Sequence, residues 1–315
     1  MTSDLTATGT RHNPKMFEAP IPTLDCNGRK LVLDGPRIMG VLNLTPDSFS
    51  DGGAYASVGD AVARGIAMVE EGADLIDVGG ESTRPGAEAV STADEIARVV
   101  PVITALAKQV AVPISIDTSK PEVMRAAVAA GAGLVNDVRA LREDGALEAV
   151  ASLGVPAILM HMQGEPRTMQ ASPQYDDVVA EVHRFLADRL LACDFAGLDR
   201  KRVLVDPGFG FGKTLEHNVA LLKQLRRFTE LGVPLAVGLS RKTTIGKLTG
   251  RESPAERVHG SVVAALIAVQ RGAIVVRVHD VAATKDALAV WSAIGSEAAP
   301  KATPTKPKIS LFDDD

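Results

Sequence analysis

The chain has 315 residues, 46% hydrophobic and 3% aromatic, and its 34 Lys and Arg against 39 Asp and Glu give a formal net charge of −5. This is enough apolar material for one large core, such as a (β/α)8 barrel, which needs about 250 residues. The charge balance opposes general nucleic-acid binding, which depends on neutralising phosphates. No apolar run reaches about 18 residues and no signal peptide is recognisable, so we expect no membrane partner. Two distant cysteines, Cys26 and Cys193, fit a reduced cytoplasmic protein.

The two ends of the chain lack the pattern of a globular fold. Residues 1–20 are polar and interrupted by proline, and residues 297–315 mix Pro, Lys and Thr before three final aspartates. Segments of this composition are typical of flexible tails. We therefore expect flexible segments at 1–20 and 297–315, with a single domain over 21–296.

Within this domain, short apolar runs alternate with longer amphipathic segments. Continuous apolar runs are typical of parallel strands buried on both faces. The segments between them have helical spacing, and several end in a glycine suited to a left-handed helix terminus. The eight runs are 37–43, 74–79, 113–117, 133–137, 156–161, 203–206, 234–238 and 273–279.

Eight strand candidates, each followed by a helix candidate, favour an α/β fold with a closed (β/α)8 TIM barrel. A doubly wound open sheet has the same alternation with fewer strands and is the alternative. A further short segment near 23–33 is consistent with a β-hairpin that closes the bottom of the barrel.

Nearly every expected strand ends in a polar side chain. In a barrel these ends meet on the carboxyl face, where active sites are built. A single strand-end aspartate commonly caps the next helix, and Asp77 and Asp137 suit that role. So many polar ends on one face are better explained by an enzyme site. They are Asn43, Asp77, Asp117, Asn136, Asp137, His161, Asp206, Ser240, Arg241, Lys242, Arg277 and His279.

These side chains divide into two chemical types. Asp117, Asn136 and Asp206 can read a flat, nitrogen-rich heterocycle through paired hydrogen bonds. Arg277 and His279 are two residues apart, so on a strand they share a face. With Asn43 across the seam between the last and first strands, they form a candidate anion pocket. A structural salt bridge of Arg277 and a hydrogen-bonded structural His279 are the alternatives.

Three loops also stand out. Residues 45–53 and 79–86 are rich in Gly, Ser, Thr and Pro, and they are either solvated turns or lids that close over a substrate. Residues 206–214 imitate a nucleotide P-loop, but Pro207 occupies the position of a required glycine. We interpret this third loop as a flexible wall, with Phe211 available to line a pocket.

Four segments resemble signatures of the dihydropteroate synthase family: GVLNLTPDSFSDGG at 40–53, DVGGESTRPG at 77–86, DPGFGFGK at 206–213 and SRK at 240–242. They occur in the family's order, and the resemblance extends from about residue 22 to residue 293. It implies a pterin-binding barrel and a transferase of folate biosynthesis. Such an enzyme condenses 6-hydroxymethyl-7,8-dihydropterin pyrophosphate with 4-aminobenzoate, giving 7,8-dihydropteroate and pyrophosphate. It also implies Mg²⁺, competition by sulfonamides and a homodimer.

The resemblance also implies roles for individual residues. The catalytic residues would be Asn43, Asp117, Lys242 and Arg277, with Asn43 as the Mg²⁺ ligand. Asp117 and Lys242 would bind the pterin, together with Asn136, Asp206, Met160, Phe211 and Gly238. Asn43, Arg277 and His279 would hold the pyrophosphate. The 4-aminobenzoate pocket would be formed by Phe49, Thr83, Arg84, Pro85 and Ser240.

Two other functions are compatible with part of this pattern. A corrinoid-linked methyltransferase that binds methyltetrahydrofolate would share Asp117, Asn136 and Asp206, but it has no use for a pyrophosphate site. A non-catalytic pterin-binding paralogue would be expected to have lost some of the catalytic residues. The synthase is therefore favoured.

Overall fold

The computed structural model describes residues 22–44, 57–82, 86–165 and 168–295. Eight parallel strands close a barrel in the order β10-β3-β4-β5-β6-β7-β8-β9, which confirms the expected α/β TIM barrel. The expected flexible segments at 1–20 and 297–315 lie outside the described residues. The strands are β3 (Arg37–Asn43), β4 (Leu75–Gly79), β5 (Ile114–Asp117), β6 (Leu134–Asp137), β7 (Ala157–Met160), β8 (Val203–Asp206), β9 (Leu235–Gly238) and β10 (Ala273–Val278).

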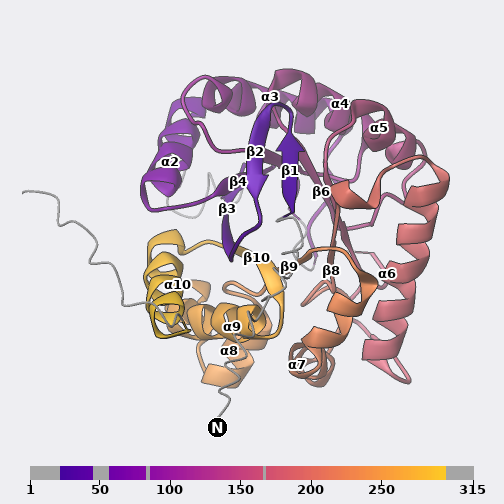
Figure 1. Ribbon diagram of the computed structural model, residues 1–315, viewed down its shortest axis with the longest axis vertical. Coiled ribbons are helices and arrows are strands. Elements are labelled where there is room, and N and C mark those ends of the chain that lie inside the picture. Colours follow the sequence, from indigo (N-terminus) through magenta and orange to yellow (C-terminus); the bar gives the residue numbers. More distant parts are fainter. Residues whose placement is uncertain (1–21, 45–56, 83–85, 166–167, 296–315) are drawn as a thin grey trace, which may run out of the picture.

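Helices follow the strands and form a ring outside the barrel (Figure 1). The connection from β9 to β10 contains two helices, α8 (Thr243–Thr249) and α9 (Val258–Gln270). Short 3₁₀ turns are η1 (Arg200–Arg202), η2 (Leu225–Leu231) and η3 (Pro254–Arg257). The helices are α2 (Val58–Glu70), α3 (Thr92–Ala107), α4 (Pro121–Ala130), α5 (Ala146–Leu153), α6 (Val178–Phe195), α7 (Leu215–Lys223), α8 (Thr243–Thr249), α9 (Val258–Gln270) and α10 (Val281–Gly295).

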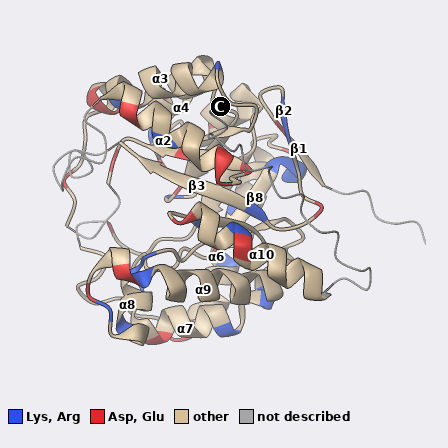
Figure 2. Cartoon of the chain, turned by 90° about the vertical axis from the view of Figure 1, so that its left-hand side faces the viewer, with Lys and Arg blue, Asp and Glu red and all other residues tan. Residues whose placement is uncertain are grey.

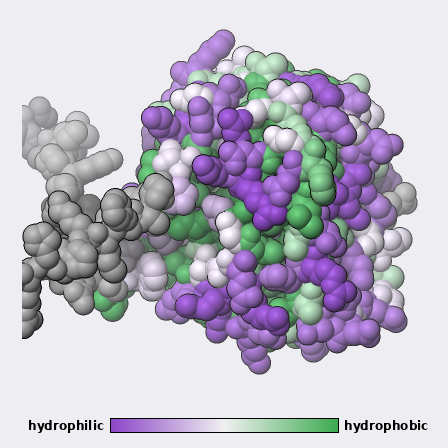
Figure 3. All heavy atoms as spheres, turned by 45° about the vertical axis from the view of Figure 1, so that its right-hand side comes forward, coloured by the Kyte–Doolittle hydropathy of each residue, from purple (hydrophilic) through white to green (hydrophobic). Residues whose placement is uncertain are grey.

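The outer helices are amphipathic, as their spacing predicts. Val62 and Met68 of α2 are buried against the barrel, and so are Val182 and Leu186 of α6. Hydrophilic side chains cover most of the face drawn in Figure 3, with smaller apolar areas between them. No described helix is both long and apolar enough to cross a membrane.

Three strands begin one residue after the proline that opens their apolar run. Pro113, Pro156 and Pro234 have no N–H to donate to the strand ladder. Their carbonyls still accept from the preceding strand, as when Ile76 N donates to Pro113 O at 3.1 Å. Proline therefore marks the amino end of each of these strands.

The expected hairpin covers the amino end of the barrel. It pairs β1 (Thr23–Cys26) with β2 (Arg29–Val32) in antiparallel register, and Figure 2 shows it at one end of the barrel. Leu24 and Leu31 of the hairpin pack against inward-facing residues of the barrel strands. Gly133 allows this close approach, because a Cβ there would lie 2.1 Å from the Cys26 carbonyl oxygen.

Inward-facing positions change from apolar to polar along the strands. In β6, Leu134 packs under the hairpin, and Asn136 is the next residue on the same face. In β3 the same change occurs between Met39 and Asn43. The barrel interior is thus an apolar plug at the amino end and a polar floor at the carboxyl end.

Candidate active site

A partly buried ion-pair network spans the carboxyl ends of four strands. Arg277 of β10 donates from Nε to Asp77 Oδ2 of β4 at 2.6 Å and from Nη2 to Asp117 Oδ2 of β5 at 2.7 Å. Asn136 Nδ2 of β6 donates to the same Asp77 oxygen at 3.0 Å. Asp77 is fully buried. Asp77 therefore joins Arg277 to Asn136, and Arg277 in turn holds Asp117.

Asp77 and Asp137, both of which suit a helix-capping role by sequence, have different roles in the structure. Asp137 does brace the following loop, accepting from the backbone N–H groups of Arg139 at 2.8 Å and Leu141 at 2.7 Å. Asp77 instead faces the barrel interior and pairs with Arg277. The position of Asp77 inside an apolar run indicates this pairing, because a buried carboxylate needs a charged partner. The salt bridge weighed as an alternative for Arg277 is present.

The environment of Asp117 makes its carboxyl group titrate near neutrality. Burial raises the pKa of Asp117 to about 7, Arg277 opposes this rise, and the nearby Asp77 adds to it. A carboxyl group with this pKa can exchange its proton at physiological pH, which is typical of functional sites.

Unpaired acceptors line the floor of this network. Asp77 Oδ1 and Asn136 Oδ1 are buried and have no hydrogen-bond partner among the described residues. Buried polar atoms are normally satisfied, so such a pair indicates a place for donors from a ligand. Asn43 and Asp117 lie on either side of Gly79: a Cβ there would be 3.6 Å from Asn43 Oδ1 and 3.5 Å from Asp117 Cβ.

Lys242 and Asp206 form the second part of the site. Lys242, which follows β9, donates from Nζ to the Phe209 carbonyl, and its Nζ lies 4.2 Å from the centroid of the Phe211 ring. Burial lowers the pKa of Lys242 to about 8, although Asp206 opposes this fall. Asp206 is buried and accepts from Gly208 N at 2.7 Å. Its pKa is raised, chiefly by burial.

An apolar wall adjoins Lys242. Phe211 is partly buried and packs on a small cluster that contains Met160 and Met162. Gly238 lies near Arg277, because a Cβ there would be 3.8 Å from Arg277 Cβ. Met160 and Phe211 thus belong to one apolar cluster beside Lys242.

Ser240 and His279 are also neighbours. The Ser240 hydroxyl lies 3.1 Å from both the backbone N and the Nδ1 of His279. His279 therefore has structural hydrogen bonds, as one of the two interpretations expected. Between Ser240 and Lys242, Arg241 has a φ of 58°, and its Nε donates to Asp280 at 3.0 Å.

No group of three or more His, Cys, Asp or Glu is placed to hold a metal ion in the described part of the chain. Four predicted site residues, Phe49, Thr83, Arg84 and Pro85, lie outside the described residues.

Comparison with known proteins places this site in a family. Residues 39–279 match the family model described as pterin binding enzyme. The dihydropteroate synthase of Escherichia coli strain K12 is 52% identical over 270 residues, which cover 86% of this chain and 95% of the relative. The chain belongs to the dihydropteroate synthase family. The predicted activity, a transferase that forms 7,8-dihydropteroate in folate biosynthesis, is confirmed.

Solved dihydropteroate synthases share the fold as well. The Xanthomonas albilineans enzyme with 4-aminobenzoic acid has 62% identity and a TM-score of 0.84, covering 88% of this chain and 100% of that one. The same enzyme with 7,8-dihydropteroate has 59% identity, a TM-score of 0.81 and the same coverage. The Yersinia pestis enzyme with a sulfonamide drug has 48% identity and a TM-score of 0.84, covering 87% and 99%.

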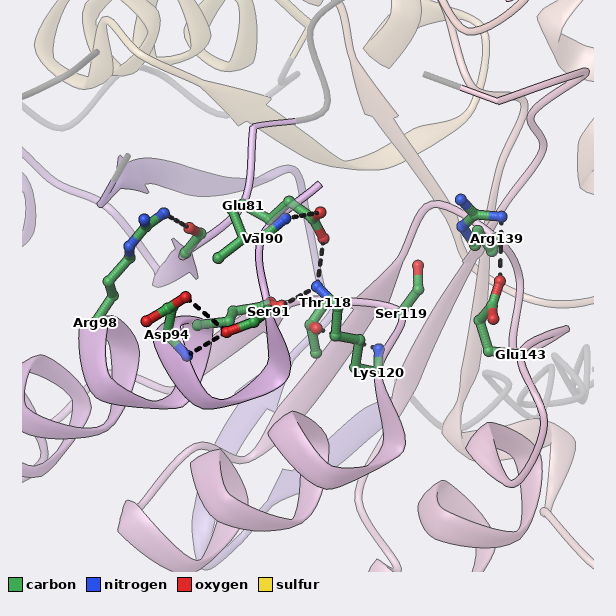
Figure 4. Close-up of polar contacts among 12 residues, drawn as sticks. Glu81, Val90, Ser91, Asp94, Arg98, Thr118, Ser119, Lys120, Arg139 and Glu143 are labelled. Atoms are coloured by element: carbon green, nitrogen blue, oxygen red, sulfur yellow. Dashed lines mark hydrogen bonds and ion pairs between the residues drawn. The ribbon is translucent and has the colours of Figure 1, made fainter. Parts of the chain in front are cut away.

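A further charged cluster, which the sequence pattern did not predict, lies near the second loop (Figure 4). Lys120 Nζ lies 2.7 Å from Glu81 Oε2 and 2.6 Å from Glu95 Oε2. Glu81 Oε1 accepts from Val90 N at 2.9 Å. Glu95 is fully buried, which helix periodicity alone does not indicate. The cluster ties residues on both sides of 83–85 to α3 and α4.

Proposed function

We propose that this enzyme joins 6-hydroxymethyl-7,8-dihydropterin pyrophosphate to 4-aminobenzoate on the carboxyl face of the barrel. The observation that carries the proposal is the Arg277 network with Asp77 and Asp117, together with Lys242 and Asp206 at the same end. The related enzyme from Xanthomonas albilineans, solved with 4-aminobenzoic acid and with 7,8-dihydropteroate, supports the choice of substrates.

The pterin would lie on the buried acceptors. Its amino and ring N–H groups would donate to Asp206, Asn136 and Asp117, since a carboxylate bound to two donors of a heterocycle discriminates strongly against other rings. Lys242 would also bind the pterin, and Met160 and Phe211 would contact its flat faces. The unpaired Asn136 Oδ1 supports this placement.

The pyrophosphate would lie at the cationic end, against Arg277, His279 and Asn43. Arg277 uses Nε and Nη2 on the two aspartates, and its guanidinium has a further nitrogen, Nη1, for an anion. The aspartates hold the guanidinium in one orientation. The positive charge is therefore in place before the leaving group acquires its negative charge, which is the condition for electrostatic catalysis.

The chemical step exchanges one bond for another. The C–O bond between the pterin methylene and the pyrophosphate breaks, and a C–N bond forms to the arylamine, which loses one proton to solvent. A neutral arylamine is a weak nucleophile, so early departure of pyrophosphate lowers the barrier most. Asp117 would stabilise the positive charge left on the dihydropterin methylene, and no covalent enzyme intermediate is needed.

The residues present fit Mg²⁺ held mainly by the substrate. Mg²⁺ prefers hard oxygen ligands and commonly takes only one or two from the protein, the rest coming from phosphates and water. Asn43 offers an amide oxygen beside Asp117, and its side chain has no hydrogen bond within the described residues. The ion would supply charge neutralisation to the departing pyrophosphate.

The aminobenzoate would approach from the outer side of the pterin. Ser240 would lie on this side, and Phe49, Thr83, Arg84 and Pro85 would complete the pocket. A sulfonamide would compete there, as the sulfonamide complex of the Yersinia pestis relative suggests.

The quaternary state and location proposed are a homodimer in the cytoplasm. Leu248 of α8 is 58% exposed and Val263 of α9 is 54% exposed. A groove of about 470 Å³ beside Leu248 is lined mainly by α7, including Leu215 and Val219. We propose that a second copy covers this face. The two buried cysteines are unpaired, consistent with a reducing compartment.

The deciding experiment measures pyrophosphate release by the purified protein supplied with the pterin pyrophosphate, Mg²⁺ and 4-aminobenzoate. We expect release that requires the arylamine and is inhibited competitively with 4-aminobenzoate by a sulfonamide. Tight pterin binding without release would instead indicate the non-catalytic paralogue. Methyl transfer from methyltetrahydrofolate to a corrinoid would indicate the methyltransferase.

A further inference from the structure

Lys213 is a buried cation that the proposed reaction does not use. Only 3% of its surface is exposed. Four acceptors surround its Nζ, namely His161 Nδ1 at 2.9 Å, the Gly208 carbonyl at 2.9 Å, the Phe211 carbonyl at 3.0 Å and the His161 carbonyl at 3.3 Å. No ion pair among the described residues includes Lys213. Its three N–H groups are thus occupied by uncharged acceptors, which leaves none for a substrate.

This arrangement is costly unless every contact is made. Burial of an ammonium group is unfavourable without hydrogen-bond partners. Burial lowers the pKa of Lys213 well below its usual value, and the neighbouring charge of Lys242 lowers it further. Burial and Lys213 likewise lower the pKa of His161 far below its ordinary value. A neutral His161 ring can therefore accept through Nδ1.

The loop between β8 and α7 folds around this ammonium group. Gly208, Gly210 and Gly212 have φ values of 69°, 81° and 59°, a left-handed conformation that favours glycine. At Gly208 there is also no room for a side chain, because a Cβ would lie 1.8 Å from the His161 carbonyl oxygen. The glycines turn the carbonyls of Gly208 and Phe211 inward, toward Lys213.

The other side of the same loop faces Lys242. The Phe209 carbonyl accepts from Lys242 Nζ, and the Phe211 ring lies 4.2 Å from that nitrogen. Both groups lie within the short segment whose carbonyls Lys213 holds at Gly208 and Phe211. One lysine thus organises the interior of the loop, and the other contacts its exterior. The loop differs from the flexible wall expected from its glycines.

We propose that Lys213 is a positioning residue for the pterin pocket. Its ammonium group holds residues 208–211 in the shape that presents the Phe209 carbonyl and the Phe211 ring to Lys242. Pterin affinity then depends on Lys213 without any contact between the two. This inference rests on the proposed role of Lys242 and Phe211 in pterin binding.

The test is a double-mutant cycle on pterin affinity, with 6-hydroxymethylpterin as the probe in a fluorescence titration. Lys213→Met retains the length of the side chain and removes its donors, and Lys108→Met, at an exposed position directly after α3, is the matched control. We expect Lys213→Met to weaken binding about ten-fold or more, the effect of losing charged hydrogen bonds, and the control to leave it unchanged. Adding Lys213→Met to Lys242→Met should cause little further loss.

Two results would overturn the proposal. One is unchanged pterin affinity in a folded Lys213→Met variant whose only defect is a lower melting temperature. The other is full additivity with Lys242→Met, which would mean that Lys213 acts independently of Lys242. If Lys213→Met does not fold, His161→Leu replaces it in the same cycle with the same criteria. Arylamine-dependent pyrophosphate release by the wild-type protein, measured in parallel, tests the proposed function separately.

Discussion

Burial raises the pKa of the Asp117 carboxyl group, and Arg277 opposes this rise. Replacement by asparagine retains the size of the side chain but removes the charge that would pair with the pterin donors. We expect Asp117→Asn to cost about 1.5–3 kcal/mol of pterin binding, the usual value for a hydrogen bond to a charged group. Isothermal calorimetry measures this, with exposed Asp144→Asn as the control. Unchanged affinity would contradict the assignment.

The titrations of Asp117 and Lys242 predict a narrow pH optimum. The pKa of Asp117 is raised to about 7, so its active carboxylate form increases as pH rises through 7. The pKa of Lys242 is lowered to about 8, so its active ammonium form is lost above that pH. We expect kcat/KM for the pterin pyrophosphate to be bell-shaped with limbs near these values. Lys242→Met should lose the upper limb, and persistence of that limb would assign it to another group.

Arg277 also has a structural role, because it neutralises the buried carboxylate of Asp77. Arg277→Met would leave the fully buried Asp77 without its ion pair, and breaking such a pair costs about 3–5 kcal/mol. We expect that loss in the free energy of unfolding, measured by urea denaturation. Adding Asp77→Asn should recover part of it, because the buried charge disappears. No recovery in the double variant would show that Asp77 is not the partner that matters.

Among the secondary-structure elements, we expect the β1–β2 hairpin to contribute to stability but not to catalysis. Leu24 is 1% exposed and packs under the barrel, whereas Val32 of the same hairpin is 39% exposed. Leu24→Ala should destabilise the protein by about 2–5 kcal/mol through the cavity it leaves, and Val32→Ala by much less. Urea denaturation measures both.

Activity provides the check on this prediction, because the hairpin lies at the end of the barrel opposite the site. The folded fraction of Leu24→Ala should keep its kcat and KM at low temperature. A large change in KM without loss of stability would mean that the hairpin affects the geometry of the active site.

For the whole molecule, the exposed apolar side chains of α8 and α9 predict the assembly state. Replacing Leu248 and Val263 by aspartate places charges on the face proposed for a second copy. We expect the wild-type protein to sediment as a dimer in analytical ultracentrifugation and the double variant as a monomer. Val290→Asp, at a 60% exposed position of α10, is the matched control. A monomeric wild type would refute the proposed dimer.

The sequence alone determined the barrel and the positions of its eight strands. Each of the eight strands lies inside its apolar run, because a parallel strand buried on both faces requires continuous apolar residues. Proline and glycine mark where elements begin and end. Pro113 precedes the first residue of β5, and Gly131, in the left-handed conformation, ends α4. Signals of this kind depend on neighbouring residues and can be read without knowing what lies across the barrel.

The tertiary structure decided how the polar residues pair. Asp77 and Arg277 are 200 residues apart in the chain, and only closure of the barrel brings β10 near β4. Lys213 follows a glycine-rich loop in sequence, yet its function depends on His161 of a different strand end. A lysine or aspartate can have the same neighbours in sequence whether its side chain is solvated, caps a helix or is buried in an ion pair. Its role depends on the partner it contacts, and packing across the fold determines that partner.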